Sequence, residues 1–228
     1  CNIVKPALPQ PAHREQTPPA RRNRPAYNGG DPTPHDTPMP AAAPSRKLLF
    51  VTSEAHPLIK TGGLGDVCGS LPQALAARGE DVRVLMPAYH DAVQRAERLR
   101  AIAQLTVPPL AQPVALLETR LPGTRVKVWL VDFPPAYDRP GNPYLNAHGH
   151  PWHDNAARFA LLARVATMIA LGAAGLAWRP ELVHAHDWQA GLVPALLAAA
   201  PQRPATVFTI HNLAYQGLFP YDTFQTLG

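Results

Sequence analysis

A short segment that combines one lysine with three glycines is the first part of the chain whose residues could do chemistry. Residues 60–66 read Lys-Thr-Gly-Gly-Leu-Gly-Asp and come directly before a predicted helix. Glycines at a helix N-terminus let backbone N–H groups approach an anion, and Lys60 adds a cation suited to phosphate. The order differs from a Walker A loop, and the glycine spacing misses the dinucleotide fingerprint by one residue. Composition alone therefore leaves phosphate binding and a flexible surface turn equally open.

Two histidines at the end of a predicted strand form the second candidate group. His184 and His186 are separated by one residue and are followed by Asp187 and Trp188. The period of two in a strand places both histidines on one face. With His211 as a third ligand, the pair is one hypothesis for a metal-dependent hydrolase. No cluster of Cys or carboxylates supplies the remaining ligands, so we rank this below a sugar site and below an ordinary strand end.

A third polar pair follows the last predicted strand. The side chains of His211 and Asn212 can each donate and accept hydrogen bonds, as sugar hydroxyls require. The alternative is a turn capped by the asparagine. Trp188 is likewise compatible with a core position or with the lining of a sugar site.

Strands and helices alternate around these three groups. Predicted strands cover 47–52, 81–86, 126–131, 182–185 and 206–210, and predicted helices cover 66–78, 154–175 and 188–200. Residues 89–121 mix a helix with short strands, and 133–152 form a long polar loop. The alternation predicts an α/β fold with a Rossmann-like, doubly wound parallel sheet. Ligands of such sheets bind outside the carboxyl ends of the strands, where all three groups lie.

The N-terminal residues differ from the rest of the chain. Residues 1–46 hold eleven of the 28 prolines and few apolar side chains. Such a segment cannot offset its ordering entropy, so we predict a disordered tail over 1–46 and a domain over 47–228. Because the chain lacks an initiator Met and ends at Gly228, we expect a fragment at both ends.

Charge, cysteines and hydropathy restrict the possible partners and compartment. Part of the net charge of +5 lies in the tail, and no basic stripe interleaved with aromatics follows it, so we expect no nucleic acid partner. Cys1 and Cys68 make no disulfide framework, which fits a reducing compartment, the cytoplasm. The apolar run 159–177 is interrupted by Arg164, so we expect a buried helix and no membrane partner.

Five motifs occur in an order that resembles one known family. They are SEAHPLIKTGGLGDV (53–67), YDRPGNPY (137–144), WRP (178–180), HAHDW (184–188) and HNLAYQG (211–217). Together they resemble the bacterial glycogen synthases and plant starch synthases over about residues 47–220. The resemblance implies the N-terminal half of a GT-B glycosyltransferase, in which two Rossmann-like domains face each other across a cleft.

The same resemblance implies a reaction. Glucose would pass from ADP-glucose to the non-reducing end of an α-1,4-glucan such as glycogen, with retained anomeric configuration and with no metal or cofactor. The family's second domain supplies a basic pair and a glutamate, so the fragment alone is expected to be inactive. We see no pair of carboxylates of the kind that retaining hydrolases use, which agrees with front-side displacement.

The resemblance also implies roles for individual residues. The catalytic candidates are His211, placed against the transferred glucose, and Asp187. The candidate substrate-binding residues are Lys60, Gly62, Gly63, Asp66, Tyr144, His211 and Asn212. The metal hydrolase built on His184, His186 and His211, and a non-catalytic module that binds a nucleotide sugar or glucan, stay open as alternatives. So do the preference for ADP- or UDP-glucose and the oligomeric state.

Overall fold

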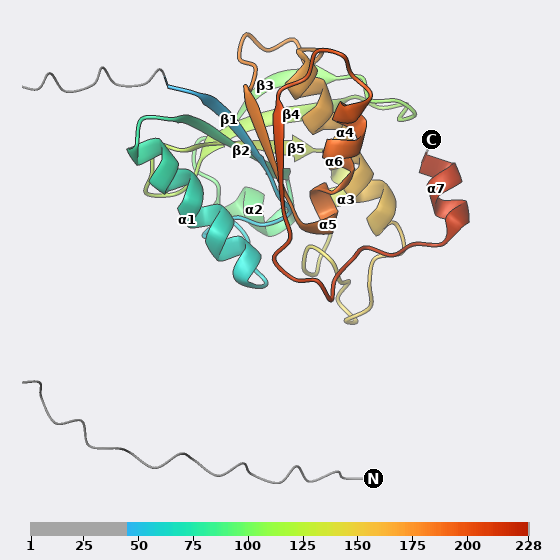
Figure 1. The fold of residues 1–228 in the computed structure, drawn as a ribbon. Helices are drawn as coiled ribbons and strands as arrows, with labels where there is room; N and C mark the ends of the chain where they lie inside the picture. Colours follow the sequence, from blue (N-terminus) through green and yellow to red (C-terminus); the bar gives the residue numbers. More distant parts are fainter. Residues whose placement is uncertain (1–44, 228) are drawn as a thin grey trace, which may run out of the picture. The chain divides into compact units, whose positions relative to one another are not determined.

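Seven strands form one sheet in the computed structural model, which describes residues 45–227 (Figure 1). The strands are β1 (Lys47–Val51), β2 (Asp81–Pro87), β3 (Arg100–Leu105), β4 (Val114–Arg120), β5 (Lys127–Asp132), β6 (Leu182–His186) and β7 (Ala205–Thr209). The helices are α1 (Gly63–Ala77), α2 (His90–Arg95), α3 (Pro134–Tyr137), α4 (Asn155–Leu171), α5 (Asp187–Ala190), α6 (Leu192–Ala198) and α7 (Tyr221–Leu227). The predicted tail lies outside the described residues apart from Ser45 and Arg46.

The strand order is β3-β4-β5-β2-β1-β6-β7, and the five strands from β5 to β7 are parallel. This confirms the predicted α/β fold. The departure lies at one edge, where β4 pairs antiparallel with both β3 and β5. Only residues 106–113 connect β3 to β4. A connection that short joins antiparallel neighbours, whereas a parallel crossover needs a dozen or more residues.

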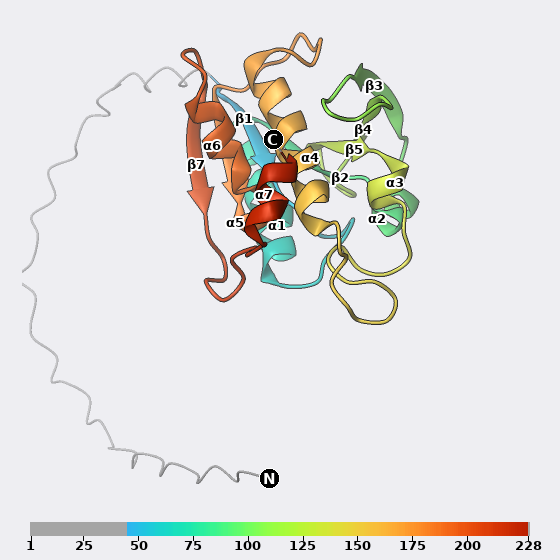
Figure 2. The same cartoon turned by 90° about the vertical axis from the view of Figure 1, so that its right-hand side faces the viewer.

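Helices cover both faces of the sheet. In Figure 1 the sheet is seen nearly along its edge, with α1 on one side and α4 and α6 on the other. Figure 2 shows α4, α6 and α7 in front of the strands and α1 behind them. The central strand β1 is therefore covered on both faces, and Leu49, Phe50 and Val51 are fully buried. This explains why β1 is continuously apolar instead of alternating.

The helix boundaries differ from the predicted ones because of glycines. α1 begins at Gly63, three residues earlier than predicted, so part of the glycine segment forms its first turn. α4 ends at Leu171 because Gly172 takes a left-handed conformation with φ of 80°. The predicted helix over 188–200 is two short helices, α5 and α6, that meet at Gly191.

The apolar run at 159–177 lies mostly in α4, and its side chains are largely buried in the core. No helix among residues 45–227 is long and apolar enough to cross a membrane. Cys68 is a buried free thiol, and burial raises its pKa to about 12, so it stays protonated. Cys1 lies outside the described residues.

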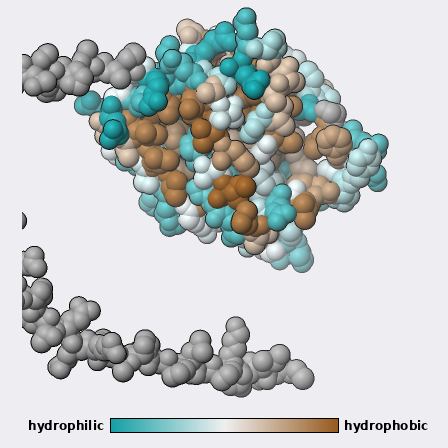
Figure 3. Space-filling view, viewed as in Figure 1, coloured by the Kyte–Doolittle hydropathy of each residue, from teal (hydrophilic) through white to brown (hydrophobic). Residues whose placement is uncertain are grey.

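Strand β7 ends the sheet on one side and is less covered than the other parallel strands. Val207 and Phe208 are each 43% exposed, and Ile210 just beyond the strand is 52% exposed. In Figure 3 hydrophobic side chains gather on the face of the molecule that carries α1 and β7. The apolar core of the described residues thus continues to the surface along this edge.

The direction of the connections selects one place for a ligand. The chain leaves β1 towards α1 on one face and leaves β6 towards α5 and α6 on the opposite face (Figures 1 and 2). Since β1 and β6 are neighbours, the loops after them diverge. Ligands of open α/β sheets bind at such a switch point.

The close approach of α1 to the loop after β1 depends on Gly69. A Cβ atom there would overlap the carbonyl oxygen of His56, whereas a Cβ at Gly63 would meet nothing within 4 Å. We expect Gly69→Ala to lower the free energy of unfolding by about 1–3 kcal/mol in urea. Gly63→Ala is the matched control and should change it by about 1 kcal/mol or less. Equal effects of the two variants would contradict this packing.

Candidate active site

The three groups singled out in the sequence lie at the carboxyl ends of neighbouring parallel strands. The loop with Lys60 follows β1, Asp187 follows β6, and His211 follows β7. The loop after β5 reaches the same region, because the Tyr144 hydroxyl lies 2.8 Å from the Ser53 hydroxyl. The expectation that these groups gather at one edge of the sheet is thus met by the strand order.

Glu54, for which the sequence indicated no role, connects two of these segments. Glu54 lies three residues beyond the end of β1 and is only 2% exposed. One oxygen, Oε1, accepts hydrogen bonds from the Thr61 hydroxyl at 2.7 Å and from the Tyr144 hydroxyl. The other, Oε2, accepts from the backbone N–H groups of Thr61 and, at 3.3 Å, Gly62. A carboxylate between a buried strand and a glycine segment was the signal available in the sequence.

Because of these hydrogen bonds, fewer N–H groups of the glycine segment can bind an anion. The Gly62 N–H points to Glu54 and is therefore not free for a phosphate. Gly63 begins α1, and the first N–H groups of a helix have no intrahelical acceptor. Lys60 Nζ lies 2.7 Å from an Asp66 carboxylate oxygen, and both side chains are about half exposed. Lys60 would have to exchange Asp66 for a bound anion.

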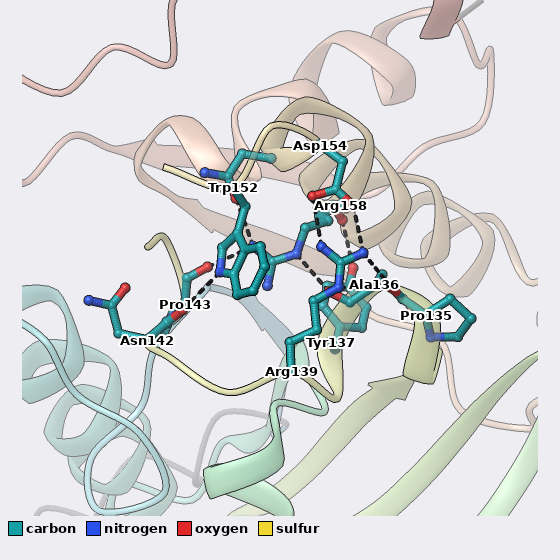
Figure 4. Close-up of polar contacts among 10 residues, drawn as sticks. Pro135, Ala136, Tyr137, Arg139, Asn142, Pro143, Trp152, Asp154 and Arg158 are labelled. Carbon is teal, nitrogen blue, oxygen red and sulfur yellow. Dashed lines mark hydrogen bonds and ion pairs between the residues drawn. The ribbon is translucent and has the colours of Figure 1, made fainter. Parts of the chain in front are cut away.

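The loop that carries Tyr144 is held by a buried arginine on α4 (Figure 4). Arg158 is 2% exposed, and its Nε donates to the Ala136 carbonyl at 2.7 Å. Its Nη1 donates to the Pro143 carbonyl at 2.9 Å, and the Tyr137 hydroxyl donates to the Arg158 carbonyl at 2.6 Å. One guanidinium thereby fixes both ends of residues 136–143, which the sequence predicted only as a polar loop.

A second arginine closes the rest of this loop. Arg139 forms a two-pronged ion pair with Asp154, at 2.9 and 2.7 Å, and its guanidinium lies 5.0 Å from the centre of the Trp152 ring. Asn155 donates to the Tyr144 carbonyl at 3.0 Å. Burial raises the pKa of Tyr144, and the charge of Glu54 adds to the rise. The Tyr144 hydroxyl therefore stays protonated and donates to Glu54.

Four rings form a cluster across β1, β6 and the end of β7. Phe50 lies 4.9 Å from His184 and 5.3 Å from His186, measured between ring centres. The rings of His184 and His186 stack at 4.0 Å, so they share one face as predicted. The rings of His186 and His211 meet edge to edge, with their centres 5.3 Å apart and their planes 25° apart. His184 Nε2 lies 2.7 Å from the Thr209 hydroxyl oxygen, and His186 Nδ1 lies 3.0 Å from His211 Nε2.

This arrangement is the wrong geometry for the metal hydrolase hypothesis. Ligands of one ion must converge on a common point. Here His184 turns its Nε2 to a hydroxyl, while His186 and His211 turn nitrogens towards each other. Among residues 45–227, no group of three or more His, Cys, Asp or Glu side chains is placed to hold a metal ion.

Asp187 anchors the loop that follows β7. Its carboxylate is 8% exposed and accepts the His211 backbone N–H at 2.7 Å. Its own backbone is left-handed, with φ of 54°, an uncommon conformation for a non-glycine residue at the start of a helix. Asn212 Oδ1 accepts the Ala214 N–H at 2.9 Å, so the asparagine-capped turn is present. Trp188 packs edge-on against Phe159 at 5.0 Å and is partly buried against the core.

Glu54 and Tyr144 should contribute jointly to stability. Tyr144→Phe removes the hydroxyl that bonds both Glu54 and Ser53, and should cost about 1–2 kcal/mol in urea unfolding. Glu54→Gln should cost more, because its amide group would face the Thr61 and Gly62 N–H groups. In the double variant we expect a coupling energy of about 1 kcal/mol. Strictly additive effects would show that the two side chains do not act together.

His186 should make the fold sensitive to acid. Burial, with His184 and His211 nearby, lowers its pKa from 6.5 to about 3 in the folded chain. Between these values the unfolded chain binds a proton that the folded chain does not, so stability falls as the pH falls below 6.5. From pH 6.5 to 5 the loss due to His186 should be about 1.5 kcal/mol.

The measurement is urea unfolding at both pH values. Asparagine does not titrate. Between pH 6.5 and 5 the free energy of unfolding of His186→Asn should therefore fall by about 1.5 kcal/mol less than that of the wild type. An identical pH dependence in the two proteins would contradict the buried neutral histidine.

Comparison with known proteins relates the chain to one family. A family model described as the starch synthase catalytic domain matches residues 47–228. The chain is 59% identical over 181 residues to glycogen synthase 1 of Methylococcus capsulatus and 54% identical over 182 residues to glycogen synthase of Cellvibrio japonicus. These matches cover 79% of this chain but only 36% and 37% of the two relatives. The chain thus spans about a third of their length.

A solved structure shows the same fold. The catalytic domain of starch synthase IV from Arabidopsis thaliana, bound to ADP and acarbose, superposes with a TM-score of 0.66 at 24% identity. The match covers 79% of this chain and 36% of that one, and it confirms the predicted fold of the N-terminal half of a GT-B glycosyltransferase. From the family match and these relatives, the chain belongs to the starch synthase catalytic domain family.

Proposed function

We propose that this chain is the N-terminal part of a glycogen or starch synthase, a glycosyltransferase that moves glucose from ADP-glucose to the non-reducing end of an α-1,4-glucan. One observation carries the proposal. The neighbouring strands β1, β6 and β7 bring the lysine–glycine segment, Asp187 and His211 to the same edge of the sheet. The names of the relatives and the ADP and acarbose in the Arabidopsis structure support this choice of substrates.

The donor's diphosphate is the group that needs charge stabilisation as the glycosidic bond breaks. The N-terminus of α1, from Gly63 onwards, offers N–H groups and the positive end of the helix dipole. Lys60 would leave Asp66 and pair with a phosphate oxygen, and Asp66 would remain beside it. Gly62 acts through its bond to Glu54, which keeps the segment in place for the phosphates.

The transferred sugar would lie against His211, Asn212 and Tyr144. The Asn212 side-chain nitrogen makes no hydrogen bond within residues 45–227, so it is available for a hydroxyl. The Glu54 carboxylate accepts hydrogen bonds from its own loop, and the Asp187 carboxylate accepts the His211 backbone N–H. A carboxylate committed in this way is a poor nucleophile, which supports front-side displacement with retention over a double displacement. Asp187 serves by positioning His211.

The remaining two thirds of the relatives' length would complete the cleft, so we expect the 228-residue chain alone to be inactive. No metal or cofactor enters the proposed reaction. The cytoplasmic location and the absence of nucleic acid and membrane partners stay predictions from the sequence. The sequence leaves the choice between ADP- and UDP-glucose open, and ADP-glucose as the donor is part of the present proposal.

The test is ADP release from ADP-glucose with glycogen as acceptor, in the full-length protein that carries this chain. Lys60→Ala and His211→Ala should each lower kcat/KM by at least about a hundredfold, which corresponds to a few kcal/mol of lost transition-state stabilisation. Lys47→Ala is the matched control, because Lys47 lies at the opposite end of β1 and should be neutral.

Three outcomes separate the alternatives. Full activity in both site variants would disprove the residue roles. Glucan binding without any ADP release in the full-length protein would favour the non-catalytic module. A UDP-glucose reaction faster than the ADP-glucose reaction would reverse the donor preference.

A further inference from the structure

We propose that His186 holds His211 in the tautomer that carries its proton on Nδ1, so that His211 presents a hydrogen-bond donor to the site. That the acceptor of this donor is an oxygen of the transferred sugar rests on the proposed function. The tautomer itself rests only on the contacts of the side chains of His184, His186 and His211.

The first step is the contact between the two rings. His186 Nδ1 and His211 Nε2 are 3.0 Å apart, the distance of a hydrogen bond. Exactly one proton can lie between two such nitrogens. Either His186 donates from Nδ1 and His211 accepts, or His211 donates from Nε2 and His186 accepts. The two possibilities give His211 opposite tautomers.

The second step is the other nitrogen of His186. His186 is fully buried, and its Nε2 has no hydrogen-bond partner within residues 45–227. If His211 were the donor, a neutral His186 would carry its proton on Nε2, as a buried N–H without an acceptor. Buried N–H groups without a partner are rarer in proteins than buried acceptors without one. The arrangement of lower free energy therefore leaves Nε2 of His186 unprotonated and places the proton on Nδ1.

The third step concerns the charge of His186. A doubly protonated ring would donate from both nitrogens and would again leave a buried N–H unpaired. Burial, with His184 and His211 adjacent, keeps the pKa of His186 at about 3, so the ring is neutral near pH 7. The His186 ring also stacks against Phe50, whose ring offers no hydrogen-bond acceptor.

The consequence appears on His211. Because its Nε2 accepts from His186, a neutral His211 carries its proton on Nδ1. Nδ1 makes no hydrogen bond within residues 45–227, and the ring is only half-buried. Asp187 fixes the backbone of the same residue through its N–H. His211 is thus oriented from two sides and offers an N–H to an oxygen lone pair. His186 is a positioning residue that acts through His211.

The test is NMR spectroscopy of the 228-residue chain labelled with ¹⁵N-histidine, at pH 7. Protonated and bare ring nitrogens differ widely in ¹⁵N shift, and His211→Ala assigns the His211 signals. We expect Nδ1 of His211 to be protonated and Nε2 bare. A His211 protonated on Nε2, or on both nitrogens, would overturn the proposal, and this reading needs no variant of His186 that folds.

Two substitutions of His186 sharpen the result. His186→Asn places an amide N–H where the Nδ1–H lies, and should keep the Nδ1–H form of His211. His186→Leu removes the donor and should shift His211 towards the Nε2–H form that free histidine prefers. An unchanged His211 tautomer in a folded His186→Leu variant would contradict the role of His186.

Activity is a separate measurement. In the full-length protein we expect His186→Leu to lower kcat by about tenfold or more, the value for loss of one hydrogen bond of about 1.4 kcal/mol. His186→Asn should recover most of that loss. No ADP release in the wild type, together with an Nδ1–H His211, would disprove the proposed function and leave the tautomer standing. ADP release by the wild type together with a His211 protonated on Nε2 would disprove the tautomer and leave the proposed function standing.

Discussion

The parallel pairing of β1 with both β2 and β6 is the constraint on which the rest of the site depends. The strand that follows β1 in the chain, β2, lies on one side of β1, whereas β7, which follows β6, lies on the opposite side of the sheet. The chain therefore leaves β1 and β6 towards opposite faces. The loops after β1 and β6 diverge for that reason and leave a space between them outside the carboxyl ends of the two strands. Glu54 lies in the loop after β1, and Asp187 comes directly after β6, so the two acids lie on the two sides of this divergence.

Both of these acids act on the protein's own backbone. Glu54 receives the N–H groups that open the glycine segment, and Asp187 receives the N–H of His211. Buried carboxylates are tolerated only when such donors surround them. The same bonds set the positions of Lys60 and His211 before any ligand arrives. The site is therefore organised by buried polar contacts that come from its own loops, and little of that organisation has to be created on binding.

Arg158 on α4 is a second buried charged group that organises a loop through hydrogen bonds to its backbone. Its guanidinium is buried and bonds carbonyl oxygens and an amide in place of a carboxylate. Burial lowers its pKa, although aromatic rings from Tyr89 and Tyr137 lie within 6 Å of it. The carbonyls that it satisfies belong to the loop that delivers Tyr144 to Glu54. A long loop is thus held by buried hydrogen bonds at the point where it meets the site.

Alternation of apolar segments with helical ones was sufficient to predict the α/β fold and the strands β1, β2, β5, β6 and β7, because each is a short apolar run bounded by a helix or a turn. The edge with β3 and β4 was not predictable in detail, since short strands with partly exposed faces carry a weak pattern. Helix ends were misplaced where glycines permit a helix to begin or stop without a strong signal.

For the site, residue types and order determined which side chains belong to it, since strand ends that share a sheet edge must lie together. Tertiary structure alone decided what each side chain does there. The sequence cannot show that the Gly62 N–H bonds to Glu54, or that the nitrogens of His184, His186 and His211 do not converge on one point. Nor can it show that His186 Nε2 is buried with no hydrogen-bond partner among the described residues. The geometry of these contacts follows from how the loops fold back on the strand ends and how the strands pack and twist, which residue types alone do not specify. Local sequence therefore names the chemical groups, and packing sets their partners, their protons and their direction.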